Sequence, residues 1–128
     1  MSRILLIDDN PTVTTLYGAA LRNAGHQVDV AHDGDAGLAA LARVSPDVII
    51  LDLAMPKTNG LEVLSAIRSN PAFGSTPVLV FSNTFTSERM QQVWDRGATQ
   101  VLSKASSTPK QILEAVRTSL AATGQSGQ

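Results

Sequence analysis

Apolar residues along the chain group into five short runs, which predict five buried β-strands. The runs are Ile4–Ile7, Val28–Ala31 (interrupted by Asp29), Val48–Leu51, Val78–Phe81 and a weaker one at Thr99–Leu102. Central strands of a parallel sheet are covered on both faces, so they are apolar throughout and do not alternate with polar residues. The runs therefore favour a sheet whose middle strands lie inside the protein.

Helical spacing of apolar residues appears between these runs. The first helix is predicted from positions at i, i+3, i+4, i+7 and i+8, namely Val13, Leu16, Tyr17, Ala20 and Leu21. Asn10-Pro11 predicts its start, because asparagine caps helices and proline suits the first helical position. Asn23-Ala24-Gly25 predicts its end. The same spacing predicts four more helices, around 38–42 (closed by Ser45-Pro46), 61–67, 90–94 and 112–120.

Strand and helix alternate five times, which defines the fold class. The connections are short, so each helix must cross from one strand to a parallel neighbour. We expect an α/β fold, a five-stranded parallel sheet with helices on both faces. The 128 residues suit one domain, which we place at residues 1–121. Residues 122–128 are small and polar, and we expect a disordered tail there.

Composition and charge exclude several classes of function. Hydrophobic residues make up 43% of the chain and the net charge is −1, so a core is expected and a basic nucleic-acid or membrane surface is not. The chain has no cysteine, which removes disulfides, thiolate metal sites and cysteine nucleophiles. The first apolar run stops at Asp8 and resembles no signal peptide. We expect a soluble, cytoplasmic protein.

Polar residues with chemical potential follow the predicted strands. They are Asp8-Asp9 after the first, His32-Asp33-Gly34 after the second, Asp52 after the third, Ser82-Asn83-Thr84 after the fourth and Ser103-Lys104 after the fifth. In open α/β sheets ligands bind beyond the carboxyl ends of the strands. If strands one, three, four and five are neighbours, three carboxylates, a hydroxyl and an ammonium meet at one rim.

This set of groups favours phosphoryl chemistry on a metal-binding rim. Clustered carboxylates bind a hard cation such as Mg²⁺ in preference to zinc. A lysine and a serine beside them are suited to an anion, so Asp52 is a candidate carboxylate nucleophile that forms an aspartyl-phosphate. Each residue alone has an ordinary role as a cap, turn former or solvated charge. The joint pattern at one end of several strands carries the inference.

Four segments resemble a known family: ILLIDDNP, VIILDLAMPKTNGLEVL, PVLVFSN and GATQVLSKA. In this order the chain is similar, from about Ile4 to Leu120, to the receiver domain of bacterial two-component response regulators, including the single-domain chemotaxis type. The resemblance implies a flavodoxin-like doubly wound sheet of strand order 2-1-3-4-5. It also implies a signalling receiver that catalyses only its own aspartyl phosphorylation and dephosphorylation, and not an enzyme with a separate substrate.

The resemblance assigns metal roles around the phosphoacceptor. Asp52 would receive a phosphoryl group from a phosphohistidine. Asp9 and Asp52 would bind Mg²⁺ through their carboxylates, Ala54 through its backbone carbonyl and Asp8 mainly through water. Gly60 would permit a backbone bend in the loop that follows Asp52.

The resemblance also implies a switch and partners. Ser82 would bond a phosphate oxygen and Lys104 would pair with the phosphoryl group. Phosphorylation would shift an existing equilibrium at the face of the fourth helix, fifth strand and fifth helix. The partners would be a sensor histidine kinase or phosphotransfer protein and a downstream protein target, with no nucleic acid and no membrane.

Two positions depart from the family pattern. The aromatic residue usual three positions before the lysine is Val101 here, so the ring that reports phosphorylation is absent. The proline usual after the lysine, with its cis bond, is Ala105, where a cis bond costs about 3–4 kcal/mol. We expect either a strained cis bond or a rebuilt loop after Lys104. Both departures affect output more than phosphoryl chemistry.

Other functions fit parts of the pattern. One alternative is a pseudo-receiver, an interaction module that signals without phosphorylation. A magnesium-dependent phosphatase would need an acid at position 54, where Ala54 cannot transfer a proton. A nucleotide-binding loop is not formed by GDAGLA, which lacks the spacing. His26 and His32 are expected at the surface, and Trp94 is either a partly buried packing residue or a partner contact.

Overall fold

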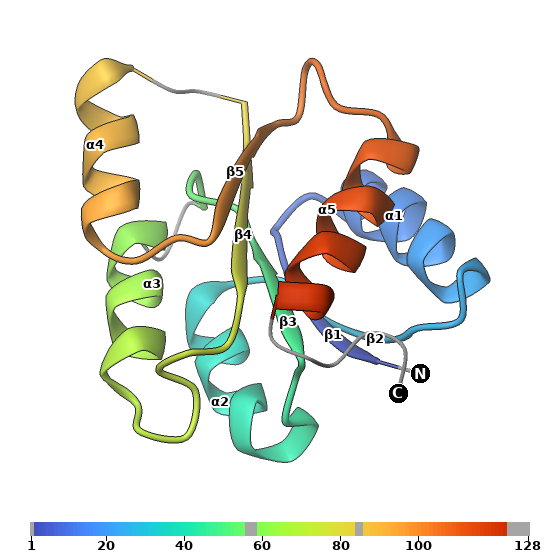
Figure 1. Ribbon diagram of the computed structural model, residues 1–128, viewed down its shortest axis with the longest axis horizontal. Helices are drawn as coiled ribbons and strands as arrows, with labels where there is room; N and C mark the ends of the chain where they lie inside the picture. The colour runs from blue at the N-terminus through green and yellow to red at the C-terminus, as the bar shows by residue number, and fades with distance from the viewer. Residues whose placement is uncertain (1, 56–58, 84–85, 123–128) are drawn as a thin grey trace.

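A computed structural model describes residues 2–55, 59–83 and 86–122, in which strands and helices alternate (Figure 1). The elements are β1 (Arg3–Ile7), α1 (Pro11–Asn23), β2 (Gln27–Ala31), α2 (Gly34–Val44), β3 (Val48–Leu51), α3 (Gly60–Ser69), β4 (Val78–Ser82), α4 (Ser87–Asp95), β5 (Gln100–Ser103) and α5 (Pro109–Ala122). Each strand begins or ends within one residue of an apolar run in the sequence. The α5 helix includes Ala122, which the sequence analysis placed in the tail, and residues 123–128 lie outside the described part.

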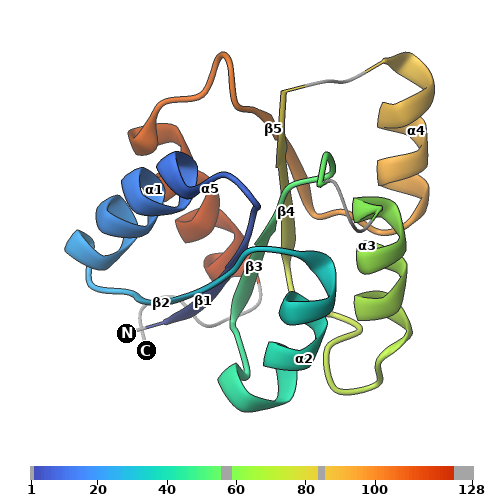
Figure 2. The ribbon, with the colours of Figure 1, turned by 180° about the vertical axis from the view of Figure 1, so that it is seen from behind.

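The five strands form one parallel sheet in the order β2-β1-β3-β4-β5. This confirms the expected fold class and strand order. Helices α1 and α5 cover one face of the sheet, and α2, α3 and α4 cover the other (Figures 1 and 2). Because β1 and β3 are neighbours in the middle, the residues that follow them lie side by side at one end of the sheet.

The sheet separates two hydrophobic cores, and successive strand residues alternate between them. In β1, Leu5 and Ile7 face the core beneath α2–α4, while Ile4 and Leu6 face the core beneath α1 and α5. Every residue of β3 and β4 is buried. Apart from Ser82 at the end of β4, these strands are unbroken apolar runs because both of their faces are covered. The carboxyl ends of β3 and β4 are therefore held between two packed cores.

The ends of α1 follow the sequence signals. The Asn10 side chain accepts hydrogen bonds from the N–H groups of Thr12 (2.9 Å) and Val13 (3.4 Å), and Pro11 occupies the first turn. Gly25 follows the helix with φ 98°, a conformation that glycine adopts without strain. No helix within the described ranges has the length and apolar character needed to cross a membrane.

One sequence expectation for α1 is wrong: Leu16 is 52% exposed. The buried stripe of the helix consists of Thr14, Tyr17, Gly18 and Leu21. This stripe has helical spacing but is turned away from Leu16. It includes a threonine, whose hydroxyl donates to the Pro11 carbonyl at 3.2 Å, and a glycine, so hydropathy alone did not identify it.

Candidate functional site

Three carboxylates meet where β1 and β3 end. Ile7 and Leu51 are register partners, so Asp8 and Asp52, which follow them, lie next to each other. Asp8 is 1% exposed and Asp52 is 3% exposed. One carboxylate oxygen from each of Asp8, Asp9 and Asp52 lies within 4.8 Å of the others, and among the described residues no other group of three or more acids, histidines or cysteines is this close. The meeting of acids expected from the sequence is therefore observed.

Lys104 bridges two of these acids. Its Nζ lies 2.7 Å from Asp8 Oδ2 and 3.4 Å from Asp52 Oδ2. Backbone groups contact the remaining oxygens: the Asn10 N–H donates to Asp8 Oδ1 at 2.9 Å and the Ala54 N–H donates to Asp52 Oδ1 at 3.2 Å. One ammonium thus offsets part of the cost of burying two carboxylates.

The three carboxylates outnumber the single ammonium of Lys104, and the pKa of Asp52 is raised in this setting. Burial raises the pKa of the Asp52 carboxyl above its ordinary value, and the charge of Asp8 raises it further. Lys104 and the Ala54 N–H act in the opposite direction without cancelling these effects. Asp9 is half-buried and makes no ion pair with any residue in the described part of the chain. An all-oxygen set that is short of positive charge fits a hard divalent cation.

The β4 and β5 strands bring the lysine and the serine to this cluster. Ser82 and Ser103 are register partners, and the Lys104 N–H donates to the Ser82 carbonyl at 3.0 Å. Ser82 is 1% exposed, and its Oγ has no hydrogen-bond partner among the described residues. A buried hydroxyl without a partner is costly, so this group is available to a ligand.

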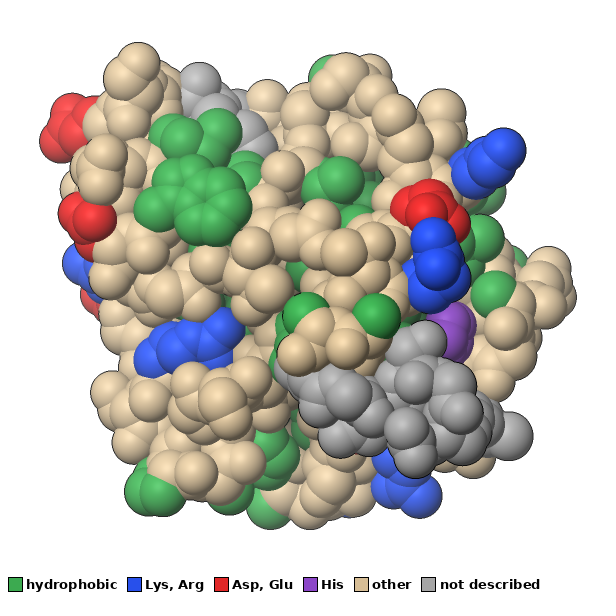
Figure 3. Space-filling model, in the orientation of Figure 1, with side chains coloured by type: hydrophobic (Ala, Val, Ile, Leu, Met, Phe, Trp, Pro, Cys, Tyr) green, Lys and Arg blue, Asp and Glu red, His purple; other side chains and the backbone are tan. Residues whose placement is uncertain are grey.

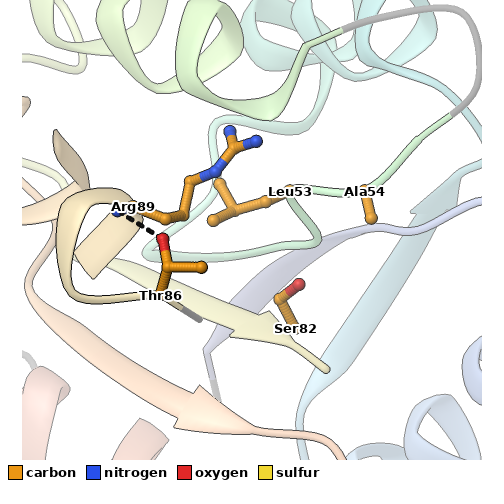
Figure 4. A pocket seen from close by; sticks show the side chains of 5 residues that line it. All are labelled: Leu53, Ala54, Ser82, Thr86 and Arg89. Atoms are coloured by element: carbon orange, nitrogen blue, oxygen red, sulfur yellow. Dashed lines mark hydrogen bonds between the residues drawn. The ribbon is translucent and has the colours of Figure 1, made fainter. Parts of the chain in front are cut away.

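Two hollows adjoin these groups. An open one of roughly 500 Å³ is lined by Asp9, Asn10, Pro11, Asp52, Ala54, Asn83 and Lys104. A smaller one of about 160 Å³, on the α4 side, is lined by Leu53, Ala54, Ser82, Thr86 and Arg89 (Figure 4). In this view the Ser82 side chain points into the smaller hollow. Ala54 lines both hollows, so the hollow that contains Asp52 adjoins the hollow that contains Ser82.

Gly60 supports the loop after Asp52, but not in the way expected. Its backbone is not in the positive-φ region. A Cβ at this position would lie 2.5 Å from the Leu53 Cα and 2.9 Å from the Asp52 carbonyl oxygen. Glycine is therefore needed for close approach of the backbone, and not for a bend. Residues 56–58 of this loop lie outside the described part.

The structure describes both positions that depart from the family pattern, Val101 and Ala105. Val101 is half-buried and packs against the core beneath α2–α4. No peptide bond within the described ranges is cis, so of the two alternatives for Ala105 the strained cis bond is not found. Lys104, Ala105 and Ser106 form a turn after β5.

Other candidates from the sequence lie elsewhere. Asp33 caps α2, accepting from the Ala36 N–H at 2.7 Å, and His32 is exposed. His26 is half-buried, and burial lowers the pKa of its imidazole. Trp94 is 46% exposed on α4, the helix near which Figure 3 shows a hydrophobic patch. Thr84 lies outside the described residues.

Asn10 lines the larger hollow and its N–H contacts Asp8, whereas the sequence pattern predicted only a helix cap at this position. Its position as a helix cap directly after the two acids was the available signal, because a cap places its backbone N–H near the preceding side chains. Asn83 was noted at a strand end but given no role, and it also lines the hollow.

The chain resembles known proteins over most of its length. Residues 4–117 match the family model described as the response regulator receiver domain. PilH of Pseudomonas aeruginosa is 33% identical over 106 residues, which cover 81% of this chain and 86% of PilH. A structure of the chemotaxis protein CheY4 of Vibrio cholerae superposes with a TM-score of 0.88 at 31% identity, covering 94% of this chain and 99% of that one.

Several relatives are longer than this chain. The transcriptional regulatory protein TrcR of Mycobacterium tuberculosis is 43% identical over 77 residues, which cover 60% of this chain and 29% of TrcR. The transcriptional regulator RpaA of Synechocystis is 36% identical over a segment that covers 81% of this chain and 43% of RpaA. The chain thus spans less than half the length of these two relatives.

Proposed function

The chain belongs to the family of response regulator receiver domains, and on this basis we propose that it accepts a phosphoryl group on Asp52 from a phosphohistidine of a sensor kinase or phosphotransfer protein. One observation carries the proposal. The Asp52 carboxylate is 3% exposed, lies 3.4 Å from the Lys104 ammonium and shares a cluster with two further acids. A buried acid beside a cation and a metal-binding set is suited to a charged acyl-phosphate.

The reaction requires Asp52 in its ionised form. A carboxylate oxygen attacks phosphorus, and the bond from phosphorus to the donor imidazole nitrogen breaks, with its electron pair remaining on nitrogen. The Lys104 ammonium, already 2.7 Å from Asp8 and 3.4 Å from Asp52, pairs with the phosphoryl oxygens. Asp8 keeps Lys104 at the site before the phosphoryl group arrives.

Asp8, Asp9 and Asp52 would hold Mg²⁺ with the help of the Ala54 carbonyl. Asp9 and Asp52 would bind through carboxylates. Asp8 would act mainly through water, because its two oxygens already contact the Asn10 N–H and the Lys104 ammonium. When bound, the cation supplies the positive charge that lets a phosphoryl group approach three acids.

Ser82 would transmit the change. Its buried, unpartnered hydroxyl would donate to a phosphoryl oxygen and draw the end of β4 toward Asp52. This would shift an existing equilibrium at the α4–β5–α5 face, where a downstream protein binds. Val101 contributes no ring to the shift. The alternative, a phosphorylation-independent interaction module, differs in needing neither Mg²⁺ nor Asp52.

The test is the intact mass of the purified chain after incubation with acetyl phosphate, with and without Mg²⁺. We expect one added phosphoryl group, dependent on Mg²⁺ and lost in Asp52→Asn. Asp35→Asn, an exposed acid in the first turn of α2, is the matched control and should behave like the unsubstituted protein. Unchanged mass with acetyl phosphate and with phosphohistidine donors, together with no Mg²⁺ binding, would support the interaction module.

A further inference from the structure

A row of aromatic contacts connects Lys104 to helix α1 and back to the loop after β5. Lys104 Nζ lies 5.9 Å from the centroid of the Phe81 ring, over its face. The rings of Phe81 and Tyr17 meet edge to face, with centroids 5.0 Å apart and an interplanar angle of 74°. The Tyr17 hydroxyl donates to the Ser107 carbonyl at 3.4 Å. The row therefore begins and ends in the same short segment, residues 104–107.

The first contacts in this row restrict where the ammonium lies. Lysine carries its charge on a flexible four-carbon stem, so two carboxylates alone leave it several positions. A ring face attracts a cation, and this attraction strengthens where water is excluded. Phe81 is 1% exposed and Tyr17 is 9% exposed, so the ring beneath Lys104 is itself held in place. Phe81 lies in β4 directly before Ser82, and the contact of its ring with Lys104 Nζ brings the ring to the edge of the proposed phosphoryl site.

The last contact restricts the loop that carries Lys104. The loop is fixed at its start by the Lys104 N–H, which donates to the Ser82 carbonyl, and at its end by reciprocal hydrogen bonds of 2.7 and 3.2 Å between Thr108 and Gln111. Between these points Ala105 and Ser106 are exposed. Between these two ends, the Tyr17 hydroxyl holds the loop through its hydrogen bond to the Ser107 carbonyl.

We propose that Tyr17 and Phe81 position Lys104 at the acidic cluster and so set the rate at which Asp52 accepts a phosphoryl group. They are positioning residues and touch neither the phosphoryl group nor the metal. The effect on rate rests on the proposed function, whereas the placement of Lys104 does not. Phe81 acts directly through its ring, and Tyr17 acts by holding both that ring and the loop.

Nuclear magnetic resonance of the unphosphorylated protein tests the placement. The Phe81 ring current should shift the ε-methylene protons of Lys104 upfield. Tyr17→Leu and Phe81→Leu should both move that resonance toward its value in an unstructured peptide. Tyr17→Phe keeps the ring and should preserve the lysine resonance while changing the amide signals of residues 105–107. An unchanged lysine resonance in Tyr17→Leu and Phe81→Leu would overturn the proposal.

The rate of phosphorylation by acetyl phosphate at saturating Mg²⁺ tests the consequence. We expect a fall of about threefold for Tyr17→Phe and about tenfold for Tyr17→Leu, the scale of one weak hydrogen bond and of an added aromatic contact. Val116→Ala is the control, because it removes volume from the same core without belonging to the row. Equal losses in Val116→Ala and Tyr17→Leu would contradict the proposal. If the unsubstituted chain gains no phosphoryl group from acetyl phosphate or from phosphohistidine donors and binds no Mg²⁺, the proposed function fails, and the lysine resonance still decides the placement.

Discussion

The centre and the edge of the sheet differ in packing, and they contribute different parts of the site. β1 is buried from Ile4 to Ile7, and all of β3 and β4 is buried, whereas every residue of β5 is only half-buried. The centre supplies Asp8, Asp52 and Ser82. The edge supplies Lys104, and the adjoining α4 carries the exposed Trp94. The proposed phosphoacceptor, Asp52, therefore follows a fully buried strand, and the lysine that contacts it follows a half-buried one.

This difference suggests how a small chemical change could reach a surface. Local stability varies across a fold, and elements with few buried contacts open and shift most easily. In α4 only Val93 is buried, compared with five residues in each of α3 and α5. A phosphoryl group that altered the contacts of Lys104 and Ser82 would act on this lightly packed side.

Truncation of one apolar strand residue in each region should separate the two regions most strongly. Ile50→Ala in β3 should lower the free energy of unfolding by roughly 3–4 kcal/mol, because it leaves a cavity in a fully packed core. Val101→Ala in β5 should cost about 1 kcal/mol, because Val101 is half-exposed. Urea unfolding of both variants measures the contrast. Equal losses would show that the edge is packed as firmly as the centre.

Arg68 joins the two regions and should have the next largest effect. Its guanidinium donates to the carbonyls of Gly97 at 2.9 Å and Thr76 at 2.7 Å, which tie the loop before β5 to the loop before β4. Arg68→Lys cannot make both contacts and should cost about 2 kcal/mol. Arg43→Lys is the control, since the ion pair of Arg43 with Asp29 is exposed and 3.9 Å long, and this variant should lose under about 0.5 kcal/mol.

Amide hydrogen exchange of Arg68→Lys and Arg43→Lys should show which part of the sheet loses stability. Arg68→Lys should increase exchange at the amides of β5 more than at those of β3. A uniform increase across the sheet would mean that Arg68 supports the whole fold and not the edge in particular.

Asp52→Asn should stabilise the metal-free protein at neutral pH. Burial and Asp8 raise the pKa of Asp52, so the folded chain holds that proton more tightly than the unfolded chain. Stability contributed by this group therefore falls as pH rises from the ordinary aspartate range, about 4, through the raised pKa. The advantage of Asp52→Asn should be largest above the raised pKa and should vanish as pH falls below the ordinary range.

Thermal unfolding from pH 4 to pH 8 without metal measures this advantage. Adding Mg²⁺ should raise the melting temperature of the unsubstituted chain more than that of Asp52→Asn. Asp35→Asn, which removes an exposed charge, should show neither behaviour. A variant less stable than the parent at neutral pH without metal would contradict the charge balance described for the site.

Trp94→Ala should have the smallest effect on stability. Trp94 is 46% exposed on α4, so its removal should change the free energy of unfolding by about 0.5 kcal/mol. The same substitution should weaken binding to a protein target if the α4–β5–α5 face is the output surface. Chemical unfolding and target binding, measured together, separate packing from recognition, and a loss above about 2 kcal/mol would place Trp94 in the core.

The sequence predicted the strands and the acidic cluster well for one physical reason. Strands such as Val48–Leu51 are buried on both faces, so each residue must be apolar and the run ends where the core ends. The parallel arrangement then places Asp8 and Asp52 at the same end. Neither step depends on how individual side chains pack.

Contacts between distant segments could not be predicted in this way. The exposure of Leu16 follows from how α1 is turned on the sheet, and the bridging role of Arg68 follows from where two loops meet. The approach of Tyr17 to Phe81 joins α1 to β4. Hydropathy of one segment carries no information about the partner that another segment supplies.

The most direct test of the account is the position of the added phosphoryl group. The chain, phosphorylated by acetyl phosphate in the presence of Mg²⁺, is digested and its peptides are mapped by mass spectrometry. We expect one phosphoryl group on the peptide that contains Asp52, and on no other, and we expect it to be released by hydroxylamine and to be labile in both acid and base, as a mixed anhydride is. A phosphoryl group on His26, His32 or Ser82 instead, with the Asp52 peptide unmodified, would contradict it.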